Sequence, residues 1–302
     1  MRSAWSLAVP CRFSAEASAF SEYVSVERVP FVDRREVLQQ IHGAMRAASP
    51  ERPPVFFIKA PGGMGKTELL REVLRRCRSG EWDGQRWAAA NDAIDFYHLG
   101  THTVEGLSSA IHDALQPGPS FFINFRSRLR DLKERRSHIV GLPQPVSDAL
   151  RDLVGRALIE DLNAMAHVRP AVLALDTAER LLYEPDEVQK ALGMEDIGVA
   201  VLPWLLREFL PKVHNVFVIL AGRPEPETPA RLFEDLRQSV GERLHVIELA
   251  AFSLEDALEY WEAASRAAEE ERPDLAAWLR AIGPDRRRVI HRYTGGRPIL
   301  LS

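Results

Sequence analysis

The feature that most constrains the fold is a glycine-rich turn between a short apolar run and an amphipathic helical pattern. The apolar run covers residues 55–58, and the turn that follows reads Ala60-Pro61-Gly62-Gly63-Met64-Gly65-Lys66-Thr67. Residues 68–77 then place their apolar side chains at helical spacing. A strand, a glycine-rich turn and a helix in this order are typical of a phosphate-binding loop at the end of a buried strand.

This loop predicts a set of phosphate and metal contacts. Glycines let backbone N–H groups converge on phosphate oxygens, and the positive end of the following helix adds to the attraction. We expect Lys66 to reach the β- and γ-phosphates and Thr67 to ligate Mg²⁺ through its hydroxyl. The usual pattern begins with glycine, where this chain has Ala60. The predicted nucleotide contacts in the loop are Pro61, Gly62, Gly63, Met64, Gly65, Lys66, Thr67 and Glu68.

Other strand-like runs define the fold class. They cover residues 94–99, 171–175, 216–221 and 244–249, and helical sequence separates them. Strands that alternate with helices predict an α/β fold, a five-stranded parallel sheet with helices on both faces. We expect a leader at 1–29, a nucleotide-binding domain at 30–250 with a helical insertion at about 103–168, and a small helical subdomain at 251–302.

Composition narrows the class of protein. The chain has 302 residues, 46% of them hydrophobic, which is enough for a sizeable core. Its net charge of −4 gives no overall attraction to nucleic acid or to an anionic membrane. Cys11 and Cys77 lie far apart and indicate no disulfide framework. No apolar run has the length of a bilayer span, and residues 1–11 fall short of a secretion signal, so we expect a cytoplasmic protein with no membrane partner.

Three charged residues at strand ends complete the predicted site. Asp176 ends the apolar run 172–175, so it is expected to hold Mg²⁺ together with Thr67. Glu179 is the nearest carboxylate that could orient water, but its spacing from Asp176 also fits a capping box. Arg223 follows the run 216–221 and would sense the γ-phosphate or stabilise the transition state.

The ordered set of motifs resembles the STAND class of signal-transduction ATPases, which includes NACHT and NB-ARC proteins. Residues 31–34 are similar to the segment that opens its nucleotide-binding domain, although Asp33 replaces a glycine. Residues 61–67, 175–176 and 221–224 resemble its Walker A, Walker B and sensor 1 motifs. The Gly295-Gly296-Arg297-Pro298 segment is similar to the motif whose proline packs on adenine. The resemblance thus adds Val32 and Pro298 as nucleotide contacts.

The resemblance implies a switch. Proteins of this class bind ATP or ADP with Mg²⁺, hydrolyse ATP slowly and self-associate when activated, for example in bacterial stress or defence signalling. Many carry an acidic residue after the Walker B aspartate, where this chain has Thr177, which favours slow turnover. The winged helix, the C-terminal sensor repeats and the effector of such proteins are missing from this sequence, so we expect a part of a longer protein.

Two other classes of protein remain open. A nucleic-acid-remodelling ATPase of the initiator or loader kind shares the sheet and most motifs. Phe122 and Phe125 among the insertion's arginines, and the basic run 285–288, are its best support. An amphipathic helix with a solvated basic face explains the insertion better, so nucleic acid is not the expected partner. A P-loop kinase is the other alternative, whereas the absence of an Asn-Lys-x-Asp segment argues against a GTPase.

Overall fold

The structure is a computed structural model that describes most of the chain. The described residues are 31–32, 34–138, 144–182, 201–224 and 230–298. The predicted leader at 1–29, and Asp33 of the opening segment, lie outside them.

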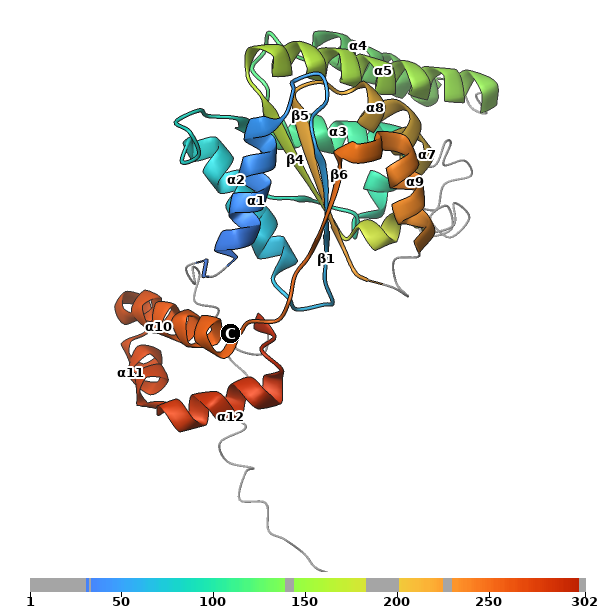
Figure 1. Ribbon diagram of the computed structural model, residues 1–302. Helices are drawn as coiled ribbons and strands as arrows, with labels where there is room; N and C mark the ends of the chain where they lie inside the picture. Colours follow the sequence, from blue (N-terminus) through green and yellow to red (C-terminus); the bar gives the residue numbers. More distant parts are fainter. Residues whose placement is uncertain (1–30, 33, 139–143, 183–200, 225–229, 299–302) are drawn as a thin grey trace, which may run out of the picture.

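A parallel sheet forms the centre of the molecule, as predicted (Figure 1). The strand order is β2-β4-β5-β1-β6, β3 also pairs with β4, and each of these pairings is parallel. Parallel strands end at the same edge, so β1, β4 and β5 bring their following residues together. The strands are β1 Val55–Lys59, β2 Ala88–Ala89, β3 Ile94–Asp95, β4 Ala171–Asp176, β5 Val216–Gly222 and β6 Leu244–Glu248.

The predicted strand at 94–99 is wrong in its extent. β3 ends at Asp95, because the Asp95 carboxylate accepts a hydrogen bond from the Tyr97 N–H at 2.8 Å and the chain turns there. Nothing in the sequence predicts β2, which at two residues is too short to show a period. β2 and β3 pair with successive parts of β4, so six strands fill the five predicted positions.

Helices cover both faces of the sheet, and alternate residues of β1 explain how. Phe56 and Ile58 pack with α1 and α2, whereas Val55 and Phe57 pack with α3, α5 and α9 on the other face. The helices are α1 Arg35–Ala47, α2 Lys66–Ser79, α3 Val104–Leu115, α4 Ile123–His138, α5 Gln144–Val168, α7 Val201–Trp204, α8 Leu210–Lys212, α9 Ala230–Val240, α10 Leu254–Glu271, α11 Pro273–Ala281 and α12 Pro284–Thr294.

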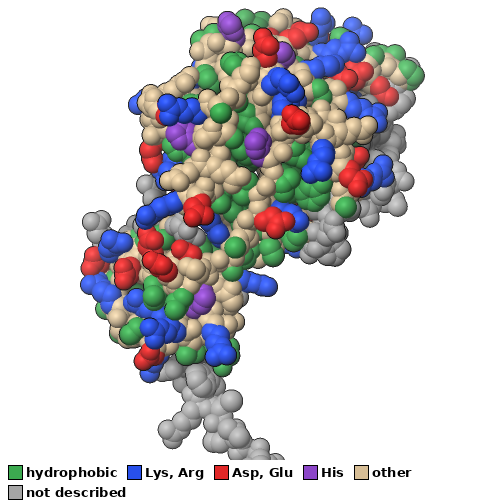
Figure 2. Space-filling model, viewed as in Figure 1, with side chains coloured by type: hydrophobic (Ala, Val, Ile, Leu, Met, Phe, Trp, Pro, Cys, Tyr) green, Lys and Arg blue, Asp and Glu red, His purple; other side chains and the backbone are tan. Residues whose placement is uncertain are grey.

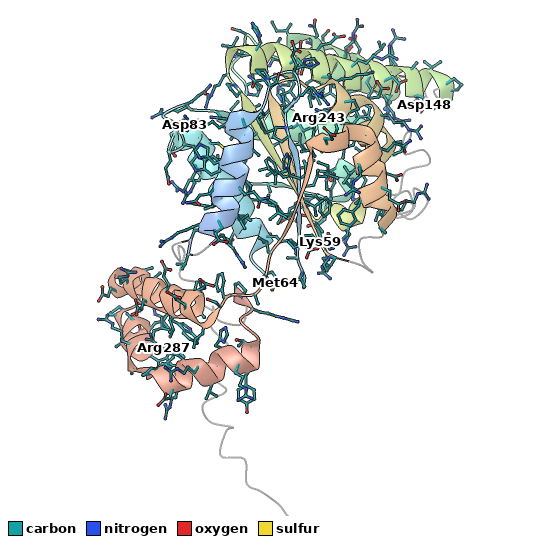
Figure 3. The ribbon with its side chains drawn as sticks, in the orientation of Figure 1. Lys59, Met64, Asp83, Asp148, Arg243 and Arg287 are labelled. Carbon is teal, nitrogen blue, oxygen red and sulfur yellow. The ribbon has the colours of Figure 1, made fainter. Side chains whose placement is uncertain are left out.

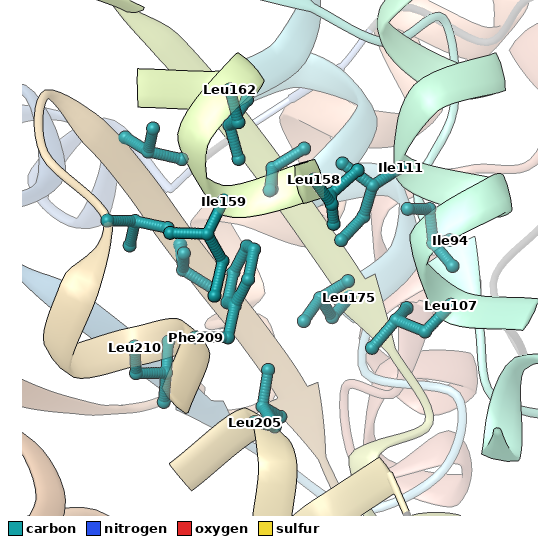
Figure 4. Close-up of a cluster of buried hydrophobic side chains, with 14 of the residues drawn as sticks. Ile94, Leu107, Ile111, Leu158, Ile159, Leu162, Leu175, Leu205, Phe209 and Leu210 are labelled. Atoms are coloured by element: carbon teal, nitrogen blue, oxygen red, sulfur yellow. The ribbon is translucent and has the colours of Figure 1, made fainter. Parts of the chain in front are cut away.

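The predicted helical insertion consists of α3, α4 and α5. α4 and α5 pack along each other at the end of the sheet opposite the phosphate loop (Figure 1). α5 is joined to the sheet by an apolar cluster that also includes α3 and the π-helical turn Leu205–Phe209. Its members include Ile94, Leu107, Ile111, Leu158, Ile159, Leu162, Leu175 and Phe209 (Figure 4).

The last three helices form a group with a small core of their own. Phe252, Ala257 and Trp261 are its buried apolar cluster. Ser253 begins α10 with a capping box, in which its hydroxyl accepts from the Asp256 N–H while the Asp256 carboxylate accepts from the Ser253 N–H. This group lies beside the carboxyl edge of the sheet (Figure 1). Within the described ranges, no helix is both long and apolar enough to cross a membrane.

Candidate functional site

The glycine-rich loop joins β1 to α2 as predicted, and two glycines carry its shape. Gly63 and Gly65 have φ values of 77° and 81°, a region that other residues adopt only with strain. A Cβ on Gly65 would meet nothing within 4 Å, so the backbone conformation, not a lack of space, requires glycine there. Gly65 is the N-cap of α2, whose first N–H groups have no acceptor within the helix. These groups are available to an anion.

Ala60, the departure from the usual pattern, fits the loop. It is buried in the same apolar cluster as Met64. Its N–H donates to the Gly222 carbonyl at 3.2 Å, which continues the pairing of β1 with β5. The methyl group therefore adds to the packing beneath the loop and does not block its outer side.

The Lys66 side chain folds back over the phosphate loop. Its ammonium group donates to the carbonyl oxygens of Ala60 at 2.6 Å and Pro61 at 2.9 Å. Burial lowers the pKa of Lys66, and the nearby charge of Arg223 lowers it further, whereas Glu179 and Asp176 oppose the shift. A phosphate group would replace these neutral carbonyl oxygens with charged acceptors.

Asp176 and Thr67 meet, as the magnesium prediction requires. Asp176 is buried at the end of β4, and its Oδ2 accepts a hydrogen bond from the Thr67 hydroxyl at 2.5 Å. A hydroxyl and a carboxylate oxygen are the ligand types that Mg²⁺ takes beside nucleotide phosphates. The residues present therefore fit the ion.

Glu179 and Arg223 form a pair next to the loop. The Glu179 carboxylate accepts from the Arg223 N–H at 3.2 Å and lies 3.3 Å from its Nε. A Cβ on Gly62 would lie 3.8 Å from Nη2 of Arg223, so the guanidinium reaches the loop. The alternative that Glu179 closes a capping box with Asp176 is wrong, because the Asp176 carboxylate accepts from the Thr177 N–H and Glu179 stands in a 3₁₀ turn, Ala178–Leu182.

The remaining predicted contacts belong to segments around the loop. The Glu68 side chain pairs with Arg71 at 2.6 Å, and its backbone N–H lies in the first turn of α2, where it has no acceptor within the helix. Val32 and Pro298 are half-buried. They come from the two ends of the part of the chain that the structure describes, so an adenine contact to both would join these two ends.

Arg34 is a residue that the sequence analysis missed. It precedes α1 in the left-handed region, at φ 68°. Its guanidinium donates to the Met64 carbonyl at 3.3 Å and lies 5.0 Å from the centre of the Phe252 ring. Phe252 in turn donates its N–H to the Gly296 carbonyl at 2.9 Å. Met64 lies on the side of the sheet that faces α10–α12 (Figure 3), so Arg34 connects the loop with that group.

Asp95 is the second missed residue. It stands opposite Asp176 in the β3–β4 pairing, and its Oδ1 accepts from the Thr177 hydroxyl at 2.6 Å. The available signal was an aspartate at the end of an apolar residue pair, which is common outside functional sites. Within the described residues, no group of three or more His, Cys, Asp or Glu side chains is arranged to hold a metal without a nucleotide.

Solved structures similar to this chain include proteins of Pyrobaculum aerophilum and Aeropyrum pernix. Cdc6p from Pyrobaculum aerophilum is 16% identical with a TM-score of 0.44, and the match covers 80% of this chain and 52% of that one. ORC1 from Aeropyrum pernix in complex with DNA is 18% identical with a TM-score of 0.48, and the match covers 89% of this chain and 61% of that one. ORC2 from Aeropyrum pernix in the ADP form is 15% identical with a TM-score of 0.49, and the match covers 91% of this chain and 62% of that one. This chain thus spans about half to three fifths of their length. Such distant similarity is no guide to function.

Family membership rests on the sequence. No protein with a curated function matches the chain. The family of the AAA ATPase domain matches residues 30–219, which is more than half of the chain and includes the phosphate loop and Asp176. The chain therefore belongs to the AAA ATPase domain family of P-loop nucleotide-binding proteins.

Proposed function

We propose that this chain is the nucleotide-dependent regulatory module of a STAND-like cytoplasmic signalling ATPase. It binds ATP or ADP with Mg²⁺, hydrolyses ATP slowly and uses the bound nucleotide to control self-association. The observation that carries the proposal is the set of contacts through Arg34 and Phe252, which link the phosphate loop to Gly296 in the C-terminal helices. These contacts would let a bound nucleotide change how α10–α12 attach to the sheet, as a regulatory module requires.

Each polar residue of the site has a role in this proposal. Backbone N–H groups from Gly62 to Glu68 receive the phosphates, and Lys66 turns from the loop carbonyls towards the β- and γ-phosphates. Thr67 and Asp176 would hold Mg²⁺, which supplies positive charge to the phosphate oxygens when it is bound. Arg223 reads the γ-phosphate, because its guanidinium already lies beside Gly62.

Slow hydrolysis follows from the state of Glu179. Its carboxylate is held by the N–H and the guanidinium of Arg223, so both of its oxygens already have a partner. When Arg223 turns towards a γ-phosphate, Glu179 loses one partner and can orient water. Thr177, which has no carboxylate, cannot take over this task. We therefore assign Glu179 the role of base, with turnover limited by its release.

The domain boundaries belong to the same proposal. Residues 30–250 act as the nucleotide-binding unit with the insertion at 103–168, and residues 251–302 act as a helical subdomain that responds to the nucleotide. In this arrangement Val32 and Pro298 contact adenine from the two units. If the two units bind each other with different strength in the ATP and ADP states, the exchange of nucleotide would shift the population of the self-associated form.

A titration with a fluorescent ATP analogue tests the nucleotide site. Lys66→Ala is expected to weaken binding roughly 10–100-fold, since it loses charged hydrogen bonds of about 1.5–3 kcal/mol. Lys59→Ala is the matched control, because Lys59 ends β1 and pairs with Glu248 at 3.0 Å. Asp176→Ala should abolish the loss of affinity that EDTA causes in the wild type. Equal affinity of wild type and Lys66→Ala would refute the assignment.

A nucleic-acid-remodelling ATPase remains the second candidate because of α4. Arg130, Lys133 and Arg135 of this helix are exposed, and Lys and Arg side chains gather along the edge of the molecule where α4 and α5 lie, with acidic ones among them (Figure 2). Phe122 and Phe125 are buried, however, and cannot stack on bases. Binding of single-stranded DNA that weakens steeply with salt, and is lost in a triple alanine variant of the three α4 cations, would favour this candidate.

A further inference from the structure

Thr177 has a conformation that the proposed function does not explain. It follows Asp176 directly and has φ 59°. A β-branched residue in the left-handed region is an outlier, because its side chain crowds the backbone there. Such conformations cost free energy and persist only where the surroundings hold them. Thr177 must therefore be held by specific contacts.

Asp95 provides the main contact. The Thr177 hydroxyl donates to Asp95 Oδ1 at 2.6 Å, and the same oxygen accepts from the Tyr97 N–H at 2.8 Å. Asp95 is itself fixed in the sheet, since β3 pairs it with Asp176 and the Phe96 N–H donates to the Asp176 carbonyl at 3.1 Å. A hydrogen bond between side chains of neighbouring strands thus fixes the residue after Asp176.

The conformation of Thr177 determines where the Asp176 carboxylate points. The Thr177 N–H donates to Asp176 Oδ1 at 2.8 Å, while Oδ2 accepts from the Thr67 hydroxyl. Rotation of an aspartate carboxylate about χ2 is otherwise soft. Because one oxygen is held by Thr177, the other is directed at Thr67, where the ion of a Mg²⁺–nucleotide complex would lie.

We propose that Asp95 and Thr177 are a positioning pair that orients Asp176 for Mg²⁺. The proposal depends on the nucleotide function proposed above, because it concerns the metal of that site. Neither residue touches the nucleotide in this assignment. Partners that orient metal-binding carboxylates typically contribute about 10–100-fold to metal affinity, which sets the effect expected here.

The test measures the affinity for a fluorescent ATP analogue over a series of Mg²⁺ concentrations. Thr177→Val, which keeps the branched shape but loses the hydroxyl, and Asp95→Ala should raise the Mg²⁺ concentration for half-maximal effect about 10–100-fold. Their affinities in EDTA should stay within about twofold of the wild type, because the phosphate loop is unchanged. Thr177→Ser, which keeps the hydroxyl, should restore the wild-type response.

Asp92→Ala is the matched control. Asp92 lies three residues before Asp95 and pairs with Arg71, so its loss should leave the Mg²⁺ response unchanged. Thermal unfolding without nucleotide shows whether each variant is folded; if Thr177→Val is not, Asp95→Ala and Thr177→Ser still decide the question. Unchanged Mg²⁺ responses in the folded variants, or equal losses with Mg²⁺ and with EDTA, overturn the positioning role. If the wild type binds nucleotide but does not respond to Mg²⁺, the positioning role is wrong. If the wild type binds no nucleotide, both the positioning role and the proposed function are wrong.

Discussion

The sheet and the C-terminal helices meet at the phosphate loop, but they differ in the size of the buried apolar core that stabilises each of them. Each face of the sheet has a large cluster of buried apolar residues, whereas the buried cluster of α10–α12 consists of Phe252, Ala257 and Trp261. Between the two parts lie Arg34, stacked on Phe252, and the ion pair of Arg35 with Glu259, whose side chains are 79% and 46% exposed.

This difference bears on how a nucleotide could act. An exposed ion pair contributes about 0.2–1 kcal/mol and a cation–π contact about 0.5–2 kcal/mol. The junction is therefore weak compared with the core of the sheet, where a single large side chain contributes more. A bound nucleotide needs to supply only a few kcal/mol of differential affinity to move the helices relative to the sheet.

The largest expected effect comes from truncating one large buried side chain in the core of the sheet and, separately, one in the core of α10–α12. Phe57→Ala removes a fully buried ring that packs on Phe233 and should cost about 3–5 kcal/mol, felt through the whole sheet. Trp261→Ala should reduce the free energy of unfolding by a similar amount, but it should speed hydrogen exchange only in α10–α12. Hydrogen exchange followed by mass spectrometry would separate these results. Loss of protection in β1 and β4 of the Trp261 variant would show that the two parts unfold as one.

A smaller effect is expected at the glycine pair that ends the helical group. Gly296 has φ 67°, and a Cβ there would lie 2.3 Å from the Phe252 carbonyl oxygen. That oxygen also contacts the His291 ring at 2.9 Å, so it cannot move freely. Gly296→Ala should destabilise the group by more than the roughly 1–2 kcal/mol expected from a left-handed φ alone.

Gly295→Ala is the control for this prediction. Gly295 has φ 59°, but a Cβ there would meet nothing within 4 Å, so only the backbone term applies. Thermal unfolding of the two variants should therefore differ. Equal midpoints would mean that the backbone around residue 296 accommodates the new Cβ beside Phe252 at no additional cost.

Much of the site could be predicted because each of its parts is local in sequence. The glycine-rich loop predicts phosphate binding within eight residues, and Asp176 ends an apolar run. Arg223 also follows such a run, and the parallel sheet then brings all three to one edge. The fold class follows from the same alternation of strands and helices.

The parts that could not be predicted depend on partners far along the chain. Thr177 and Asp95 are 82 residues apart, and their hydrogen bond exists only because β3 lies beside β4. Arg34 likewise meets Phe252 only once the helical group folds back to the loop. No periodicity reports such contacts, and β2 is too short to have one.

A third prediction concerns the junction itself. Arg34→Ala should weaken the attachment of α10–α12 by about 1–2 kcal/mol, because it loses both the contact with Phe252 and the hydrogen bond to the Met64 carbonyl. Faster hydrogen exchange in α10, with unchanged exchange in β4, would be the expected result. Arg35→Ala, which breaks the exposed pair with Glu259, should change this exchange less. If Arg35→Ala sped exchange in α10 more than Arg34→Ala did, the exposed ion pair would be the main contact that holds the junction.

The smallest perturbation uses thiols to compare how often the two parts open. Cys77 is buried on α2, and burial raises the pKa of its thiol to about 12. Because the folded pKa is above the unfolded one, this group contributes stability that is complete below about pH 8.5 and is lost as the pH rises towards 12. Up to pH 8.5, therefore, Cys77 should react with iodoacetamide only when the sheet opens.

A second thiol in the helical group completes the comparison. Ala276 of α11 is fully buried, so Ala276→Cys would report the opening of α10–α12. Cys11, which lies outside the described residues, would be replaced by serine in both proteins. At pH 8 we expect the thiol at 276 to be alkylated at least about tenfold faster than Cys77, since groups with small cores open at lower free energy. Saturating ATP should slow the reaction at 276 more than that at Cys77 if the nucleotide closes the junction. Equal rates for the two thiols would mean that the weak junction does not let α10–α12 open separately.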